Sequence, residues 1–154
     1  MDAMFTYAND PSLNLTLEER TQLQHRAHSG DAGALVWLAE LHLVGRGGFA
    51  PDLVLAVQLF QRQVSATQHP AAQMMLAMCL RDGEGCARDT DKSRRLYLAS
   101  ADQGNAYACC HAALNYSSGS HDFEKDMLWA LYYLSLIHIS EPTRPERSRM
   151  PSSA

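Results

Sequence analysis

The side chains of this sequence that could carry chemistry are its four cysteines and its histidines. Cys109, Cys110 and His111 are consecutive, and Cys79 and Cys86 come earlier in the chain. Thiolate and imidazole both bind zinc, but structural zinc sites usually take their ligands from C-x2-4-C spacings. Neighbouring residues on a helix point about 100° apart, so Cys109 and Cys110 would not readily chelate one ion. We therefore expect no metal site, and we interpret the thiols as mostly reduced and partly buried small side chains.

No other pattern at a recognisable spacing indicates catalysis. The histidines of residues 1–133 fall on different predicted elements, and none is paired in the sequence with a nucleophile or a carboxylate. The glycine runs at 45–48 and 83–85 resemble phosphate loops only superficially, because neither follows a strand or precedes a Lys-Ser/Thr pair. A glycine that ends a helix explains them better. The sequence predicts a protein that is not an enzyme, with no catalytic residue and no cofactor.

The charge balance argues against nucleic acid as a partner. The chain has 13 Lys and Arg against 17 Asp and Glu, a formal net charge of -4, and the basic residues are scattered among acidic ones. No apolar run approaches the roughly 18 residues of a membrane span, and the first residues lack the pattern of a signal peptide. We expect a protein or peptide partner, no membrane span and a cytoplasmic location.

A helical phrase that occurs three times must position these side chains. The copies begin 38 and then 36 residues apart, and each has small or aliphatic residues and a glycine at the same offsets of four, five and eleven residues. Repeats of this size bury their apolar faces only by stacking on one another. The phrase therefore predicts packing between repeats by Ala34, Leu38, Ala39 and Gly45, by Ala72, Leu76, Ala77 and Gly83, and by Ala108, Ala112, Ala113 and Gly119.

The periodicity predicts helices of two alternating kinds and no strand. A leading helix over 17–28 begins with a capping box formed by Thr16 and Glu19. The A helices contain the phrase and span 32–44, 71–81 and 105–117, each stopped by its glycine. The B helices span 52–66, 91–102 and about 125–133. Pro51, acidic residues near the helix starts, and Thr90 as the expected cap of the second B helix favour these beginnings. The sequence is thus predicted to be all-α.

These residues resemble the Sel1-like repeat, a relative of the tetratricopeptide repeat with the pattern A-x-x-x-L-G-x-x-Y-x-x-G-x-G followed by D-x-x-K-A-x-x-W-Y. The second copy fits best, with Ala72, Leu76, Gly83, Gly85 and Asp89 in family positions. The first copy keeps Gly45, Gly47, Asp52, Ala56 and Leu59-Phe60, and the third keeps Ala108, Tyr116, Gly119, Asp126 and Ala130. Alanine replaces the family glycine after Leu38, Leu76 and Ala112, and Ser120-His121 replaces the second loop glycine of the third copy.

The resemblance implies a right-handed α-solenoid of antiparallel helix hairpins. Its expected parts are a flexible lead over 1–15 and a solenoid over 16–133, made of a leading B helix at 17–29 and repeats at about 30–67, 68–103 and 104–133. Some family members join the two helices of a unit by a disulfide. Only Cys109 falls near such a position, and Ala101 occupies the partner position, so the disulfides are not expected here.

The resemblance also implies a scaffold that assembles signalling, membrane-associated or quality-control complexes. We expect the A helices to line a partner groove with Trp37, Met75 and His111, together with Glu40 and Met78 one turn further on. The competing interpretation is that these side chains are ordinary core between repeats. The alternative function is a targeting module of a larger enzyme or membrane protein.

The chain changes character at Leu134. Residues 134–144 and 148–154 resemble the translation of sequencing adapters, so we exclude 134–154 from the fold as a tail of artificial origin. The last B helix would then be interrupted. We expect apolar surface to be exposed there, and with it weak self-association or aggregation.

Overall fold

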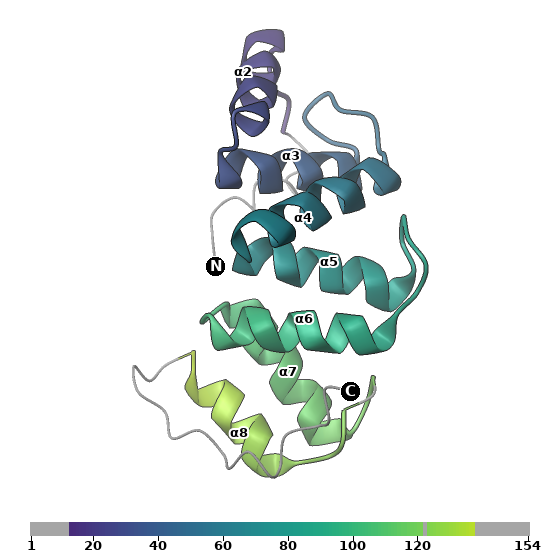
Figure 1. Cartoon of the computed structure of the whole chain (residues 1–154), viewed down its shortest axis with the longest axis vertical. Helices are drawn as coiled ribbons and strands as arrows, with labels where there is room; N and C mark the ends of the chain where they lie inside the picture. The colour runs from purple at the N-terminus through teal and green to yellow at the C-terminus, as the bar shows by residue number, and fades with distance from the viewer. Residues whose placement is uncertain (1–12, 122, 138–154) are drawn as a thin grey trace.

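The predicted helices are all present in a computed structural model that describes residues 13–121 and 123–137. Within these ranges the chain forms helices and no strand, and the helices follow one another in chain order down the long axis of the molecule (Figure 1). Each helix packs mainly against the helices before and after it in the chain. The described helices are α2 (Leu17–His28), α3 (Ala32–Val44), α4 (Leu53–Thr67), α5 (Pro70–Asp82), α6 (Thr90–Asp102), α7 (Ala106–Ser118) and α8 (Met127–Ser135).

The architecture is an all-α solenoid. The A helices α3, α5 and α7 pair with the B helices α4, α6 and α8 to form three successive hairpins, and α2 packs on α3 ahead of them (Figure 1). The predicted lead is described only from Leu13, and both Leu13 and Leu15 pack on the cluster between α2 and α3. Most of the predicted tail lies outside the described residues, but Leu134 and Ser135 continue α8 beyond the expected end at 133.

The three B helices begin in the same way. Asp52, Asp89 and Asp126 cap α4, α6 and α8, and each carboxylate accepts a hydrogen bond from an amide of the first turn. The amide of each aspartate donates to the carbonyl of the residue three before the end-glycine of the preceding A helix, at 2.8 to 2.9 Å. The predicted cap at Thr90 is therefore wrong, because Asp89 takes the cap and Thr90 is the first helical residue.

The A helices also end alike. Gly45, Gly83 and Gly119 adopt left-handed φ values of 74°, 74° and 72°, and their amides close the last turn on the fourth residue back. This conformation favours glycine because a Cβ would crowd the following carbonyl. Two residues further on, Gly47 and Gly85 are again left-handed, and in the third copy His121 takes the equivalent position with φ 54°. The backbone path is thus kept where the family glycine is missing.

Small residues of the repeated phrase lie where the helices meet. One apolar cluster runs from α3 to α8, and a second lies between α2 and α3. Every alanine and leucine of the phrase is buried: Ala34, Leu38, Ala39, Ala72, Leu76, Ala77, Ala108, Ala112 and Ala113. In the last hairpin, the ring of Tyr116 in α7 is stacked with those of Trp129 and Tyr133 in α8, and all three centroids lie within 6.0 Å of one another.

Candidate protein-interaction surface

The side chains predicted to line a groove do not form one exposed column. Met75 and Glu40 are only 2% and 3% exposed and therefore lie in the core, whereas Trp37, Met78 and His111 are half-buried. The reason is where this position faces: His111 stacks on Tyr97 of α6, and Trp37 lies beside α2. Position 37 and its equivalents 75 and 111 thus face the helix that precedes each A helix. Glu40 and Met75 are accordingly removed from the proposed groove.

A polar cluster surrounds His111 where α5, α6 and α7 meet. The ring of His111 is stacked on that of Tyr97, with centroids 3.7 Å apart and planes 10° from parallel. Arg81 Nη1 lies 3.1 Å from His111 Nε2 and donates to the Tyr97 hydroxyl at 3.4 Å. On the other side, Asn115 Nδ2 lies 2.8 Å from His111 Nδ1. The ring of His111 in α7 thus contacts side chains of α5 and α6 as well as one of its own helix.

The same surroundings keep His111 uncharged. Burial lowers the pKa of His111 to about 4, and the positive charge of Arg81 acts in the same direction. Arg81 itself is held by Asp82, whose carboxylate accepts two hydrogen bonds at 2.7 and 2.8 Å. At neutral pH this histidine can accept a proton only weakly, so the cluster fits a structural role better than acid–base catalysis.

The two buried cysteines are likewise poorly suited to chemistry. Burial raises the pKa of Cys79 to about 12 and that of Cys109 to about 11, so both thiols stay protonated at neutral pH. All four cysteines are free thiols, and Cys109 Sγ donates to the carbonyl of Ala101 at 3.4 Å. Within the described ranges, no three His, Cys, Asp or Glu side chains are grouped to hold a metal ion. None of the helices in those ranges is both long and apolar enough to cross a bilayer.

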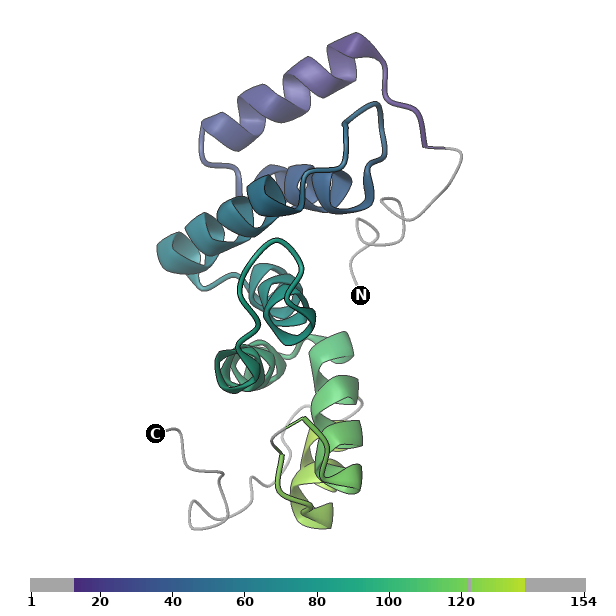
Figure 2. The ribbon, with the colours of Figure 1, turned by 90° about the vertical axis from the view of Figure 1, so that its right-hand side faces the viewer.

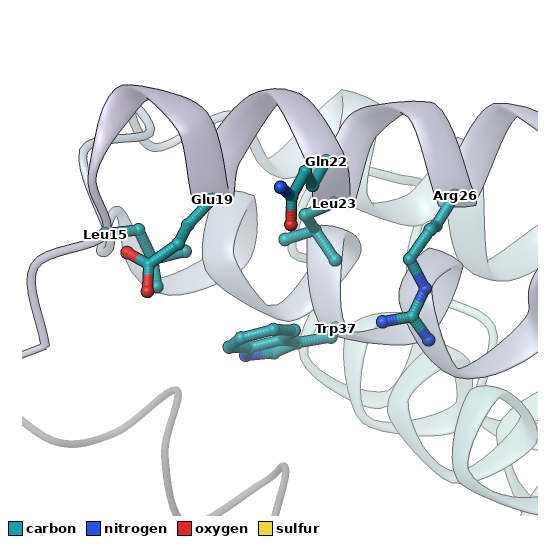
Figure 3. A pocket seen from close by; sticks show the side chains of 6 residues that line it. All are labelled: Leu15, Glu19, Gln22, Leu23, Arg26 and Trp37. Carbon is teal, nitrogen blue, oxygen red and sulfur yellow. The ribbon is translucent and has the colours of Figure 1, made fainter.

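A hollow of about 200 Å³ lies between α2 and α3, beside Trp37 (Figure 3). Leu15 and Leu23 form its apolar side, while Glu19, Gln22 and Arg26 of α2 supply the polar rim. The indole N–H of Trp37 is buried and has no hydrogen-bond partner. The rim charges are engaged elsewhere, because Glu19 accepts from Thr16 and Arg26 pairs with Asp31 at 2.6 Å. The charged groups around this hollow are therefore already hydrogen-bonded or ion-paired, and the indole N–H of Trp37 is the polar group there without a partner.

The strongest candidate surface is found by comparing equivalent positions of the three B helices. The residues five and eight places after the aspartate cap face the next A helix, as the Tyr97–His111 stack shows. In α4 and α6 these residues are buried, but in α8 they are Leu131, 58% exposed, and Leu134, 46% exposed. The buried equivalents are Val57 and Phe60 in α4, and Arg94 and Tyr97 in α6.

The A helices show the same difference. The residues nine and five places before the end-glycine are Val36 and Glu40 in α3, and Met74 and Met78 in α5; all are buried except the half-buried Met78. In α7 the equivalents are Cys110, which is exposed, and Leu114, which is 69% exposed. We call Cys110, Leu114, Leu131 and Leu134 the terminal face. It lies on the last hairpin, at the end of the solenoid away from α2 (Figure 2).

Not every exposed apolar residue of α8 belongs to this face. Met127 and Leu128 are exposed, but their equivalents in α4, Leu53 and Val54, are exposed as well, so their exposure does not distinguish α8. The positions of the terminal face differ from these, because their counterparts in both preceding hairpins are buried or half-buried. Repeat spacing identifies these positions in the sequence, although the sequence analysis predicts no role for Leu131 and places Leu134 in the tail. Only the packing shows that they are uncovered.

The comparisons with known proteins agree with this geometry. A family model described as the Sel1 repeat matches residues 32–62 and 70–105. These two stretches contain α3 with most of α4, and α5 with α6. A search of curated proteins finds no match.

Two solved structures share the fold. A Sel1 repeat protein from Oxalobacter formigenes superposes with a TM-score of 0.66 at 21% identity, covering 86% of this chain and 92% of the other. A protective antigen of uropathogenic Escherichia coli strains, c5321, described as displaying an SLR fold, gives a TM-score of 0.68 at 21% identity. That match covers 78% of this chain but only 25% of the antigen. The matched stretches are therefore similar to Sel1 repeats, and they coincide with the first two hairpins of the solenoid.

Proposed function

We propose that the chain is a non-enzymatic scaffold that binds a protein or peptide, and that it serves as an adaptor in a signalling, membrane-associated or quality-control complex. The terminal face is the observation that carries the proposal. Its side chains are apolar and open, whereas their counterparts in the two preceding hairpins are covered by protein. A contiguous exposed apolar patch on a folded domain marks a site of interaction. Stacked repeats also present extended surfaces suited to binding.

The chemistry of the remaining candidate groups supports the same conclusion. The buried thiols are held protonated and His111 is held neutral, so neither offers an activated nucleophile or a well-matched base. A scaffold needs no such group. Its specificity comes from the shape and polarity of the surface.

Quantitative affinity capture from an extract tests the proposal with matched variants. Leu114→Asp and Leu131→Asp place a charge on the terminal face, and Leu17→Asp places one on α2, where Leu17 is 73% exposed. We expect the two terminal-face variants to lose a defined set of proteins that the wild type and Leu17→Asp retain. Circular dichroism should show equal helicity for all. If all three variants capture the same proteins as the wild type, this face is not the binding site and the proposal fails.

We also propose weak self-association through this face when no partner is present, because exposed leucines of two copies can bury one another. Light scattering should give an average mass that rises with concentration for the wild type and stays monomeric for Leu134→Asp. A clean wild-type monomer at high concentration would contradict self-association.

A further inference from the structure

The third hairpin, α7 with α8, is joined to the rest of the solenoid mainly by the packing of α7 on α6. Figure 2 shows that α7 runs across the direction of α5 and α6. In a solenoid each unit contacts little beyond its neighbours. A change that weakens the contact between α6 and α7 therefore acts on the position of the whole third hairpin.

A titratable residue lies at the centre of this contact but not at the equivalent contacts. The repeat position that faces the preceding helix holds Trp37 in α3 and Met75 in α5, whereas in α7 it holds His111. Met75 is buried in one apolar core with Phe60 of α4, while the ring of His111 lies on Tyr97 of α6. Protons can therefore act on the α6–α7 contact without acting on the α4–α5 contact.

Both ring nitrogens of His111 lie against hydrogen-bond donors. Arg81 Nη1 is 3.1 Å from Nε2, and Asn115 Nδ2 is 2.8 Å from Nδ1. The Asn115 amide is held in this orientation, because Nδ2 also donates to the His111 carbonyl and Oδ1 accepts from Ser120 Oγ, both at 2.8 Å. A neutral imidazole has one accepting nitrogen, so it can accept from one of the two donors, and an imidazolium can accept from neither. Protonation thus removes the hydrogen bond that the neutral ring accepts here.

The charges around the ring also oppose its protonation. Arg81 of α5 is the nearest cation, and the ring centroid of His121, in the loop after α7, lies 6.3 Å from that of His111. Asp82 favours the charged ring, but its carboxylate is engaged by two hydrogen bonds from Arg81. From α6, burial raises the pKa of Tyr97, so its hydroxyl stays neutral. Burial, followed by the charges of Arg81 and His121, lowers the pKa of His111 to about 4.

We propose that the α6–α7 junction is a proton-operated hinge: protonation of His111 separates α7 from α6, and the third hairpin then moves as a unit while the first two hairpins stay stacked. In the open form water solvates the charge and accepts from both ring N–H groups. The open form therefore takes up a proton that the closed form rejects, so acid favours the open form and neutral pH favours the closed form. The hinge does not depend on the proposed binding role of the terminal face, because it lies in the stacking of the hairpins.

Cys109 provides a native probe of this junction. Its thiol is buried and donates to the carbonyl of Ala101 in α6 at 3.4 Å, so it becomes accessible when α7 leaves α6. Cys79 is also buried, but it belongs to α5, whose packing on α6 the hinge leaves unchanged. A dithiodipyridine reagent labels thiols in acid as well as at neutral pH, and mass spectrometry measures the two cysteines separately. A Cys110→Ser background removes the exposed neighbouring thiol.

Each labelling rate is divided by the rate of the same cysteine in the urea-unfolded chain at the same pH, which removes the effect of pH on the reaction itself. Between pH 7 and pH 5 we expect the relative rate of Cys109 to rise about fivefold, a value that allows for partial exposure of the His111 ring. The relative rate of Cys79 should not change. No rise at Cys109 would overturn the hinge. An equal rise at both cysteines would mean global unfolding, which overturns it as well.

Variants of the whole chain assign the response to His111. His111→Phe and His111→Met keep a large side chain on Tyr97 but take up no proton, so labelling of Cys109 should not respond to pH in either. His25→Phe changes an exposed histidine of α2 and should respond like the wild type. Circular dichroism at pH 7 checks that the variants are folded, and either His111 variant alone is sufficient. If a folded His111 variant keeps the wild-type response, another group opens the junction and the hinge is overturned.

Discussion

The ring of His111 in α7 lies stacked on the ring of Tyr97 in α6, with their centroids 3.7 Å apart. Tyr97 is eight places after the aspartate cap of its helix, and the same place is filled by Phe60 in α4 and by Leu134 in α8. The first two residues are buried and the third is 46% exposed. The contact of His111 with Tyr97 thus shows how one hairpin stacks on the next, and the equivalent position in α8 is left open.

The neutral state of His111 makes stability depend on pH. Burial lowers its pKa in the folded chain to about 4, below the ordinary value of 6.5, so between these values the unfolded chain binds more protons. This contribution is complete above about pH 6.5 and is lost as the pH falls toward 4. Urea unfolding should give a free energy lower by roughly 1 kcal/mol at pH 5 than at pH 7, after allowing for partial exposure of the ring.

His111→Phe keeps a ring for stacking and removes the titrating group. Its unfolding free energy should change less between pH 7 and pH 5 than that of the wild type. An equal change in the two proteins would show that other groups cause the dependence.

Equivalent positions should respond differently to truncation. Phe60→Ala removes a fully buried ring and should lower the unfolding free energy by about 3–5 kcal/mol, because it leaves a cavity beneath α5. Leu134→Ala at the matching place in α8 should change it by less than about 1 kcal/mol, since the side chain is nearly half exposed. Chemical denaturation of both variants measures the difference, and a comparable loss in both would mean that the terminal face is covered in solution.

His121 occupies a backbone position that the other two copies give to glycine. Its φ of 54° costs a non-glycine residue about 1 kcal/mol, partly offset by the contact of its Nδ1 with Asn115 Oδ1 at 2.9 Å. We expect His121→Gly to raise the thermal midpoint slightly. His121→Asn, which tolerates this conformation, should lie between the two, and His121→Val should lower the midpoint. A drop in the midpoint for His121→Gly would show that the contact with Asn115 outweighs the strain.

The contact between Cys109 and Ala101 provides a place for a disulfide. The Cys109 thiol lies 3.4 Å from the carbonyl oxygen of Ala101, across the junction of α6 and α7. Ala101→Cys should form a disulfide on oxidation and gain about 2 kcal/mol, the value expected for a short closed loop. Thiol titration and unfolding with and without reductant measure this. Unchanged free thiols after oxidation would show that the side chains do not meet in the required geometry.

The sequence alone determined the local structure. The spacing of small residues, aspartates and glycines predicted α2 and α3 at their observed bounds, and the remaining helices within two residues at each end. It predicted the capping box of Thr16 and Glu19, which the structure contains. These features are decided by hydrogen bonds within a few residues, so a short stretch of sequence is sufficient to specify them.

The proposed interaction surface depends on the tertiary structure. The sequence predicts that Trp37, Met75 and His111 line a groove, because they are large and occupy the same position in the three repeats. A shared repeat position determines where a residue lies on its own helix, but it does not determine which helix lies opposite. The same repeat position is covered at Phe60 and Tyr97 and open at Leu134. Whether a side chain is buried depends on the neighbouring helix, which the local pattern does not contain.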